Sequence, residues 1–395
     1  MALINLRNAL MAGKRLPYDA EVEYLECAGT SSVFPYINTG IVGDSNTTYE
    51  AMLWRNTRST NECAIGSWNS GNTRCWVAYY FGNKFYLGMG AQVNSDGAPQ
   101  PNVWYKQILK IESSNFNLYV DDELTATVPQ TTFTSSQPLY IGAMNSSGTA
   151  SFYFRGRFGA VKIYQNGVLV RDFIPVRKGA VGYLYDRVSG KLFGNAGTGD
   201  FVLGPDVVPV EYLQSTGTQW IDTGYIPNQQ TRWELDYQFS TIGSGSNGMF
   251  QENPTVRFNI GQGTDRFFNI SYGANNALNI ASDTLRHLFV ADIPNLQWRL
   301  DSSSGAFPAP VSTALQYSLR IFCRNSPGGT VYNLHSGRCF ASRMYQSDVL
   351  SQRLLPVRVG ASGAMMDVLT RRIYRNAGTG AFGYGNDLKY PIPAE

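Results

Sequence analysis

Residues 175–199 read PVRKGAVGYLYDRVSGKLFGNAGTG, and residues 356–380 read PVRVGASGAMMDVLTRRIYRNAGTG. The two stretches align without a gap at an offset of 181, and twelve of the 25 positions are identical. Repetition of this kind has to be recognised before any fold is assigned, because it fixes the number of structural units. The sequence therefore predicts a tandem duplication within the 395 residues.

Each stretch is predicted to form a β-hairpin that ends in a loop. In the first stretch, residues 182–186 are an apolar and aromatic run, residues 188–190 are a turn, and a return strand follows directly. Asn195, Gly197 and Gly199 suit a backbone that adopts left-handed angles or passes where a Cβ atom would clash. The loop opens no helix and lacks the Lys-Ser/Thr of a P-loop, so we interpret it as structural.

The composition favours sheets and turns over helices. Aromatic residues make up 13% of the chain and charged residues only 15%, against a usual charged share of about 25%. Asn, Gln, Ser, Thr and Gly take the place of the missing charge. The net charge of +3 is small for this length, and it predicts neither nucleic acid nor an anionic membrane surface as a partner.

The five cysteines do not predict a disulfide framework or a metal site. Their number is odd, no pair has CxxC spacing, and the repeat does not preserve them. We expect most of them to be free thiols that pack as small apolar residues, with a Cys63–Cys75 bridge as the less favoured alternative. No cofactor is predicted, and a structural calcium ion has no support in the sequence. The five are Cys27, Cys63, Cys75, Cys323 and Cys339.

Residues 1–19 stand apart as an N-terminal anchor segment. Leu3, Leu6 and Leu10, with Ile4 beside them, fall at helical spacing. A helix of about a dozen residues is marginal alone in water, so its apolar side needs a partner surface. The segment is predicted either to dock on the first domain or to anchor the protein to another subunit or particle.

The N-terminal sequence shows no secretory pattern, and no run approaches the roughly 18 apolar residues of a membrane span. We therefore expect synthesis in a cytoplasm without export through the Sec pathway, and no membrane-spanning segment. Release from the cell would still place the protein outside, as happens for virion proteins.

Two domains are predicted, at 20–206 and 210–389, followed by a short tail at 390–395. The copies open with Val-Glu-Tyr-Leu, at Val22 and at Val210, and each continues to an Ile-x-Thr-Gly unit. Short alternating runs separated by turn signals fill each copy, with almost no helical pattern. This pattern predicts two antiparallel sheets packed face to face, with the first and last strands pairing to close each unit.

The order of the motifs resembles the concanavalin A-like lectin/glucanase superfamily, and most closely the laminin-G-like domains of gut bacteria and their phages. The motifs are Glu-Tyr-Leu, Gly-Thr, Ile-x-Thr-Gly, Leu-Tyr-Val-Asp, Gly-Arg, Ile-Tyr, Pro-Val-Arg and Asn-Ala-Gly-Thr-Gly. The resemblance covers residues 20–204 and 210–387. It implies an all-β chain of two tandem jelly-roll sandwiches and, often, sugar binding or virion attachment. Copy two departs from copy one in lacking the Arg171-Asp172 pair.

No catalytic site is predicted. Glucanases of the superfamily use a strand with the pattern Glu-x-Asp-x-x-Glu, and the near match at Glu234 and Asp236 lacks the second glutamate. The repeat preserves neither His287 nor His335, so both are interpreted as packing histidines. We expect the protein not to be an enzyme.

Three aspartates could supply oxygen atoms to a calcium ion at a rim of the sandwich. They are Asp121, Asp122 and Asp301. Turn formation explains them equally well, because aspartate is a common turn residue.

The predicted ligand-binding surface is a loop of copy one that carries Trp68, Asn69, Asn72, Arg74 and Trp76. An aromatic ring can stack on the apolar C–H face of a sugar, while amide and guanidinium groups bind its hydroxyls. The alternative is that the tryptophans fill the core. Core packing is favoured over sugar binding for Trp76, and the two interpretations have equal weight for Trp68. The matching loop of copy two has no tryptophan.

The resemblance and the anchor segment together favour a non-enzymatic component of a phage virion, such as a decoration, fibre or tail protein. Its expected partners are other virion proteins, bound through the N-terminal segment, and host or mucosal glycans, and it is expected to form homo-oligomers. The alternative is a carbohydrate-binding protein of a bacterial cell surface, and a glucanase is the least favoured function.

Overall fold

The computed structural model describes most of the chain. The described residues are 16–27, 33–56, 61–69, 74–81, 84–94, 100–242, 247–252, 257–263, 265–273, 277–307, 315–326 and 329–389. They form β-strands and connecting segments, and no α-helix occurs among them. The chain divides into two compact units, with the boundary between Asp206 and Val207.

Copy one has a long first sheet. Its strands, in spatial order, are β12 (Glu123–Pro129), β11 (Asn115–Val120), β10 (Trp104–Glu112), β4 (Thr47–Arg55), β16 (Gly156–Gln165), β17 (Val168–Lys178), β18 (Val181–Asp186) and β19 (Lys191–Phe193). Three short strands complete this sheet: β1 (Ala20–Glu21), β2 (Leu25–Cys27) and β20 (Val202–Leu203).

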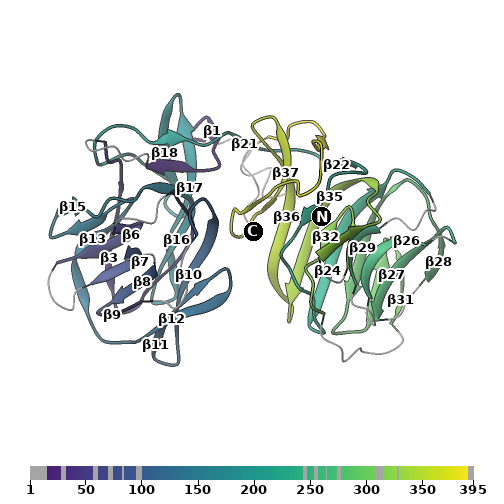
Figure 1. The fold of residues 1–395 in the computed structure, drawn as a ribbon, viewed down its shortest axis with the longest axis horizontal. Helices are drawn as coiled ribbons and strands as arrows, with labels where there is room; N and C mark the ends of the chain where they lie inside the picture. Colours follow the sequence, from purple (N-terminus) through teal and green to yellow (C-terminus); the bar gives the residue numbers. More distant parts are fainter. Residues whose placement is uncertain are drawn as a thin grey trace. The chain divides into compact units, whose positions relative to one another are not determined.

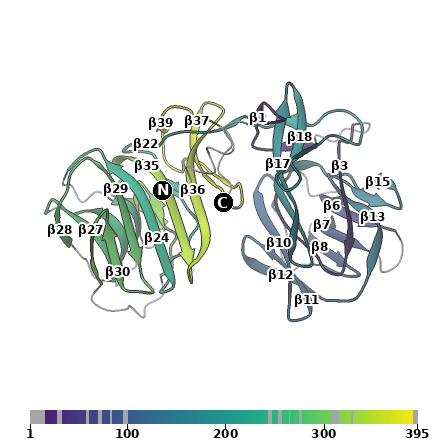
Figure 2. The same cartoon turned by 180° about the vertical axis from the view of Figure 1, so that it is seen from behind.

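The second sheet of copy one consists of two groups of strands, which Figure 2 shows gathered together. The first group is β15 (Thr149–Ser151), β14 (Met144–Ser146), β6 (Ile65–Trp68), β13 (Thr134–Ile141) and β3 (Ile37–Asp44). The second group is β5 (Glu62–Cys63), β7 (Cys75–Phe81), β8 (Lys84–Met89) and β9 (Ala91–Asn94).

Copy two repeats this plan, with β24, β35 and β36 side by side in one layer and β26, β27 and β28 in the other (Figure 1). The first sheet is β31 (Ser303–Ala306), β30 (Gln297–Leu300), β29 (Arg286–Asp292), β24 (Thr231–Phe239), β35 (Ser336–Gln346), β36 (Val349–Val359), β37 (Ser362–Asp367) and β38 (Ile373–Tyr374), joined by β21 (Val207–Pro209), β22 (Leu213–Thr216) and β39 (Gly383–Tyr384). The second sheet is β23 (Ile221–Asp222), β32 (Arg320–Ile321), β25 (Asn247–Glu252), β26 (Arg257–Gln262), β27 (Phe267–Gly273), β28 (Ala277–Ala281), β33 (Arg324–Ser326) and β34 (Thr330–Tyr332).

The core of each copy lies between its two sheets. Strand β24 shows why, because its residues alternate between buried and half-buried along its whole length. The buried members Trp233, Leu235, Tyr237 and Phe239 point into the core of copy two. Each copy has its own main apolar cluster, with contributions from both of its sheets. The predicted pair of tandem β-sandwiches is confirmed.

The hairpin of the duplicated stretch is confirmed as β18–β19 in copy one and β37–β38 in copy two. Its turn is organised by a buried aspartate. The Asp186 carboxylate accepts hydrogen bonds from the backbone N–H of Asp172 at 2.9 Å and from the Ser189 hydroxyl at 2.6 Å. The Asp367 carboxylate does the same with the N–H of Arg353 and the hydroxyl of Thr370. This aspartate is retained because its oxygens satisfy turn donors.

The Asn-Ala-Gly-Thr-Gly loop fastens the start of each copy to its end. In copy one, the Asn195 side-chain oxygen accepts the N–H of Tyr36 at 3.1 Å and that of Gly197 at 2.7 Å. In copy two, Asn376 accepts the N–H of Trp220 at 3.1 Å and that of Gly378 at 2.8 Å. The loop is therefore structural, as predicted.

Two glycines of the loop are needed for different reasons. A Cβ on Gly197 would lie 2.1 Å from the carbonyl oxygen of Phe34, and one on Gly378 would lie 2.1 Å from that of Thr218. The last glycine of the loop has a φ of +69° in copy one, at Gly199, and +72° in copy two. Close approach and a left-handed backbone together explain why the motif recurs unchanged.

The opening and closing strands of each copy pair with each other, as predicted. In copy one, β2 pairs with β20, and an isolated bridge joins Val22 to Asp206. In copy two, β22 pairs with β39, and the bridge joins Val210 to Asp387. An arginine of the duplicated stretch adds a bidentate ion pair in each copy. Arg177 binds Asp206 in copy one, and Arg358 binds Asp387 in copy two.

All five cysteines are buried free thiols, so the favoured prediction is confirmed and the Cys63–Cys75 bridge is not formed. Burial raises the pKa of each thiol above its ordinary value. Among the described residues, no group of three or more His, Cys, Asp or Glu side chains could hold a metal ion.

The N-terminal anchor residues Leu3, Ile4, Leu6 and Leu10 lie outside the described residues, so the structure does not support the expected helix. Within the part of the chain that is described, no helix is long and apolar enough to cross a membrane.

Candidate functional site

The candidate site is the outer face of the second sheet in copy one, which is the face turned away from the core. Strand register places its members, because residues directly opposite each other in neighbouring strands project to the same side. Tyr140 lies opposite both Asn38 and Gly66, and Gly66 is also paired with Met144. The flanking residues Leu139 and Ile141 belong to the main core. Tyr140 and Met144 therefore project outward.

Two pairs of stacked aromatic rings lie on this side. The rings of Tyr36 and Tyr140 have centroids 4.6 Å apart and an interplanar angle of 24°. The rings of Phe34 and Tyr153 are closer, at 4.0 Å and 17°. Tyr140 is buried, but the other three rings are half-buried. They present flat apolar surface to solvent at the outer face.

Trp68 belongs to the same face. It packs with Cys63, Met144 and Tyr86 in a small cluster that is separate from the main core. Both Trp68 and Tyr86 remain half-buried. Trp68 therefore does not belong to the main core between the two sheets. Together, Phe34, Tyr36, Trp68, Tyr86, Tyr140 and Tyr153 form what we call the aromatic face.

The other residues of the predicted loop contribute unequally. The Asn69 amide donates to the Ser136 hydroxyl at 2.8 Å, and its side-chain oxygen accepts from Ser147 at 2.9 Å, so this side chain organises neighbouring turns. Arg74 is half-buried, and its backbone oxygen accepts the N–H of Gly90. Asn72 lies outside the described residues. The same holds for the side chain of Trp76, although its backbone lies in β7.

Sequence reasoning missed most of the aromatic face. One signal was present, because the alternation Leu139-Tyr140-Ile141 places the tyrosine on the side opposite two core residues. Phe34, Tyr36 and Tyr153 gave no such signal. Phe34 and Tyr36 come from one connecting segment and Tyr153 from another, and only the folded chain brings each ring against its partner.

Copy two has different chemistry at the same place. Trp220 replaces Tyr36 and Arg320 replaces Tyr140, and the guanidinium of Arg320 lies 4.4 Å from the centroid of the Trp220 ring. Arg320 also forms an ion pair with Asp222 at 3.3 Å. A cation–π pair thus stands where copy one has two stacked tyrosines.

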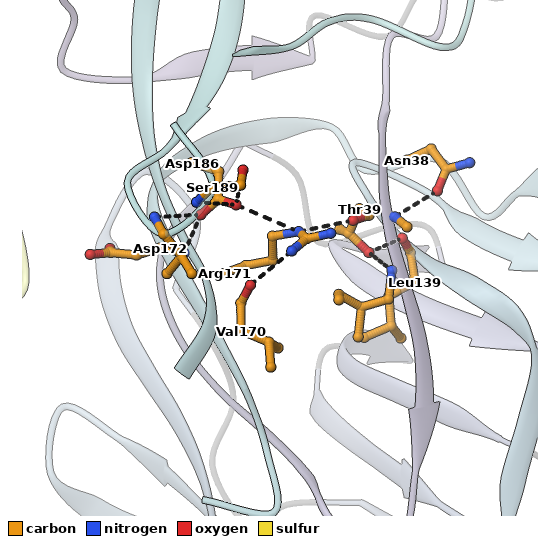
Figure 3. Close-up of polar contacts among 11 residues, drawn as sticks. Asn38, Thr39, Leu139, Val170, Arg171, Asp172, Asp186 and Ser189 are labelled. Atoms are coloured by element: carbon orange, nitrogen blue, oxygen red, sulfur yellow. Dashed lines mark hydrogen bonds and ion pairs between the residues drawn. The ribbon is translucent and has the colours of Figure 1, made fainter. Parts of the chain in front are cut away.

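The rim of the sandwich carries a polar network around Arg171, shown in Figure 3. The Arg171 Nε donates to the carbonyl oxygen of Thr39 at 3.2 Å and lies 3.7 Å from an Asp186 oxygen. In copy two, Gln352 occupies the position of Arg171, and its amide donates to the carbonyl oxygen of Thr223 at 2.9 Å. Both side chains connect the first sheet to the Ile-x-Thr-Gly unit, so the absent arginine is replaced in its structural role.

The two carboxylates of the incomplete glucanase pattern are paired with arginines. Glu234 binds Arg343 at 3.2 Å and Asp236 binds Arg286 at 2.6 Å. They project from β24 on the side opposite its core residues. This arrangement resembles surface ion pairing on an outer sheet face rather than a catalytic carboxylate pair.

The histidines have contrasting surroundings. Both ring nitrogens of His287 contact carboxylates, Asp301 at 2.6 Å and Asp283 at 2.7 Å. Burial alone would lower its pKa, but the hydrogen bonds to these aspartates raise the pKa of His287 above its ordinary value. His335 is buried, and its Nε2 lies 2.7 Å from the Tyr237 hydroxyl. Burial lowers the pKa of His335 to about 4. Packing and hydrogen bonding account for both.

The aspartates considered for calcium occupy turns. An oxygen of Asp121 accepts the N–H of Lys106 at 3.0 Å, and an oxygen of Asp301 accepts the N–H of Leu288 at 2.9 Å. Asp122 forms an ion pair with Lys106. These contacts give each aspartate a role in its turn.

Comparisons with known proteins agree with the fold. Residues 34–172 match the family model of the concanavalin A-like lectin/glucanases superfamily. The match lies within copy one and includes every residue of the aromatic face. No similar protein of curated function was found.

Solved structures give distant likenesses. A Bacteroides ovatus protein assigned a carbohydrate-binding role is 15% identical, with a TM-score of 0.35; the likeness covers 46% of this chain and 60% of that one. Domains LG4-5 of the mouse laminin alpha1 chain are 11% identical, with a TM-score of 0.31, over 96% of this chain and 97% of that one. The NanB sialidase of Streptococcus pneumoniae is 8% identical, with a TM-score of 0.24, over 89% and 75%.

The sandwich architecture, the retained closing motifs and the family match therefore agree on one assignment for copy one. Residues 34–172 carry the sequence signature of the concanavalin A-like lectin/glucanases superfamily.

Proposed function

We propose that the protein is a non-enzymatic glycan-binding adhesion protein, and that its aromatic face is the glycan-binding surface. The observation that carries this proposal is the set of half-buried rings on the outer face of copy one, with Tyr36 stacked on Tyr140 and Phe34 stacked on Tyr153. The lectin-like fold and the family match over residues 34–172 support it.

The chemistry of this face suits a neutral saccharide. Rings held by packing present their faces at little cost in conformational entropy, and they can stack on the C–H surface of a pyranose. Polar groups lie beside them. Asn38 is exposed on the same side, although its side-chain oxygen already accepts the N–H of Gly40. Its amide nitrogen is the group we assign to a sugar hydroxyl.

A glycan array probed with the full chain tests the proposal, and the duplication supplies a matched control. Tyr36→Ala and Trp68→Ala should each weaken binding of neutral glycans at least tenfold. Trp220→Ala removes the ring at the position equivalent to Tyr36, where the retained loop packs in the same way, and it should leave neutral binding unchanged. Absence of neutral-glycan binding by the unaltered chain would overturn the proposal.

We further propose that the protein is part of a phage virion and that its N-terminal segment joins it to the particle. Its support is the apolar stripe of Leu3, Ile4, Leu6 and Leu10. Deletion of residues 1–17 should leave a soluble folded protein that no longer enters the particle. Normal incorporation of the shortened chain would rule out this role of the segment.

A bacterial cell-surface carbohydrate-binding protein is the second candidate, favoured by the same aromatic face. The two differ in where the protein is found, so immunogold labelling of virions and of host cells separates them. A glucanase would release reducing sugar from β-glucans. We expect none, because Glu234 and Asp236 are each neutralised by an arginine.

A further inference from the structure

The retained Asn-Ala-Gly-Thr-Gly loop of copy one bonds the segment that carries two rings of the aromatic face. Phe34 and Tyr36 lie in the connecting segment before β3, where no strand ladder holds the backbone. Asn195 accepts the N–H of Tyr36, and the N–H of Ala196 donates to the Tyr36 carbonyl oxygen at 2.8 Å. The Thr198 hydroxyl accepts the N–H of Phe34 at 3.2 Å, and the Thr198 N–H donates to the Phe34 carbonyl oxygen at 3.3 Å. All four backbone polar groups of the two ring-bearing residues are therefore bonded to the loop.

The loop also lies against the Tyr36 ring itself. A Cβ on Gly197 would lie 2.7 Å from the ring carbon Cδ1 of Tyr36 and 3.0 Å from its Cε1. The face of the same ring stacks on Tyr140, with centroids 4.6 Å apart. Burial and the contact with Tyr140 raise the pKa of the Tyr36 phenol above its ordinary value, which agrees with a ring held against its partner. Tyr36 is thus confined between Gly197 and Tyr140.

Copy two makes the same contacts with a different ring. A Cβ on Gly378 would lie 2.8 Å from Cδ1 and 3.1 Å from Nε1 of Trp220. Arg320 lies over the Trp220 ring in place of the stacked tyrosine. The counterpart of Phe34 is Thr218, so the loop holds two rings in copy one and one ring in copy two. The loop is the element that both copies retain, and the ring is the element that varies.

A ring that is fixed before a ligand arrives binds more tightly than a mobile one. Connecting segments are generally more mobile than strands. A ring already held in place loses less conformational entropy on binding, and the affinity increases accordingly. The loop on one side and Tyr140 on the other remove this freedom from Tyr36, and the hydrogen bonds to the loop remove it from the backbone of Phe34.

We propose that the retained loop is the positioning element of the glycan-binding surface in copy one. Asn195, Gly197 and Thr198 are positioning residues that act on saccharide affinity through the rings of Phe34 and Tyr36. The proposal rests on the proposed glycan-binding function and deepens it, because it assigns part of the affinity to residues outside the aromatic face. The recurrence of the motif then has a functional reason in addition to its restricted backbone path.

The test makes the same substitution in the two copies of the full chain. Asn195→Ala removes the acceptor of the Tyr36 N–H, and Asn376→Ala removes the acceptor of the Trp220 N–H. The probes are cellohexaose, laminarihexaose, mannohexaose and xylohexaose, and the one that the unaltered chain binds most tightly is titrated by calorimetry below the first thermal transition. Asn195→Ala should weaken its binding about fivefold, because the ring is no longer fixed in advance. Asn376→Ala should leave the affinity unchanged, and Asn195→Asp, which keeps an acceptor oxygen, should recover most of it.

A second measurement separates positioning from a general loss of stability. Stacking on Tyr140 shifts the ring-proton NMR signals of Tyr36, which are assigned in tyrosine-labelled protein by their absence in Tyr36→Phe. These signals should move towards those of free tyrosine in Asn195→Ala and return in Asn195→Asp. Arg177→Ala removes the ion pair to Asp206 at the strands that close copy one. It should lower the thermal transition and change neither the Tyr36 signals nor the affinity.

Several results would overturn the proposal. Unchanged affinity in Asn195→Ala would do so, and so would an equal loss of affinity in Asn376→Ala or Arg177→Ala. If Asn195→Ala does not fold, Thr198→Val decides the question, because Thr198 is exposed and its hydroxyl accepts the Phe34 N–H. Thr198→Val should weaken binding and Thr198→Ser should not.

The positioning role and the proposed function can fail separately. Failure of every neutral glycan to bind the unaltered chain would count against the proposed function. Tyr36 signals that move in Asn195→Ala would then still show that the loop positions the ring. Tyr36 signals that stay in place would overturn the positioning role, whether or not a glycan binds.

Discussion

The two copies retain the same Asn-Ala-Gly-Thr-Gly loop, whereas the outer faces of their second sheets carry different residues. Asn195 and Asn376 make the same contacts in the two copies, down to the backbone groups that they bond. Tyr140 and Arg320 occupy equivalent positions, but Tyr140 is neutral and stacks on Tyr36, whereas Arg320 is charged and forms a cation–π contact with Trp220. Sequence identity was retained where a backbone path admits few residues. Ligand chemistry is better sought where the copies differ.

The largest effect that we expect tests the first half of this comparison. Gly197→Ala should destabilise copy one by more than about 3 kcal/mol, because the new methyl group would meet a backbone carbonyl that cannot move aside cheaply. Gly378→Ala should cost copy two a similar amount. Denaturant unfolding of the full chain measures both.

Gly179→Ala is the matched control for these two variants. Gly179 has a φ of +59°, but nothing lies within 4 Å of its added Cβ. Only the left-handed strain of about 1 kcal/mol should appear. If Gly197→Ala costs no more than Gly179→Ala, close approach is not the reason that the loop was retained.

A second prediction concerns acid stability, in which the copies should differ. His335 of copy two stands where copy one has Phe154, and burial lowers the pKa of His335 to about 4. The folded state therefore resists protonation. The contribution of neutral His335 to the stability of the folded state is fully present above pH 6.5, the ordinary pKa of histidine. It is lost as the pH falls from 6.5 towards 4. A shift of this size corresponds to about 3 kcal/mol.

Calorimetry of the full chain between pH 7 and pH 4 measures this loss. The double variant His335→Phe with Tyr237→Leu gives copy two the pair that copy one has in Phe154 and Leu53, and it avoids leaving the Tyr237 hydroxyl without its partner. The acid-dependent shift of one transition should disappear in this variant. A shift of unchanged size would show that other groups cause it.

The smallest effect tests whether Arg171 and Gln352 are interchangeable. Arg171→Gln should cost copy one about 1 kcal/mol or less, because glutamine makes the equivalent bond to a threonine carbonyl in copy two. Arg171→Ala should cost more, since the carbonyl oxygen of Thr39 and the buried Asp186 both lose a donor or a cation. Equal losses in thermal unfolding would mean that the bond to Thr39 contributes little.

The sequence was sufficient for the architecture because the architecture depends on local patterns. Period-two alternation, turn residues and a gapless repeat each constrain the backbone, and together they predicted the hairpins, the loop and the strand pairing that closes each copy. Asp186 and Gly197 were visible as identities before their contacts were known.

The aromatic face could not be predicted to the same extent. Trp68 was proposed because it borders a polar turn. Phe34 and Tyr36 lie close together in one segment, but their stacking partners, Tyr153 and Tyr140, lie far along the chain from them. Their stacking depends on how loops pack across a sheet, and no periodicity reports that. Asn69 was predicted as a polar group of the ligand-binding loop, and in the structure its side chain is hydrogen-bonded to Ser136 and Ser147 of neighbouring turns.

The bridges from Val22 to Asp206 and from Val210 to Asp387 place the first and last residues of each copy side by side. A module built this way is inherited as one uninterrupted stretch of gene, and another can be spliced in after it without cutting through a core. The same closure makes each copy a natural candidate for circular permutation. Because one copy can keep the original function, the other copy can acquire a new specificity while its scaffold stays constant.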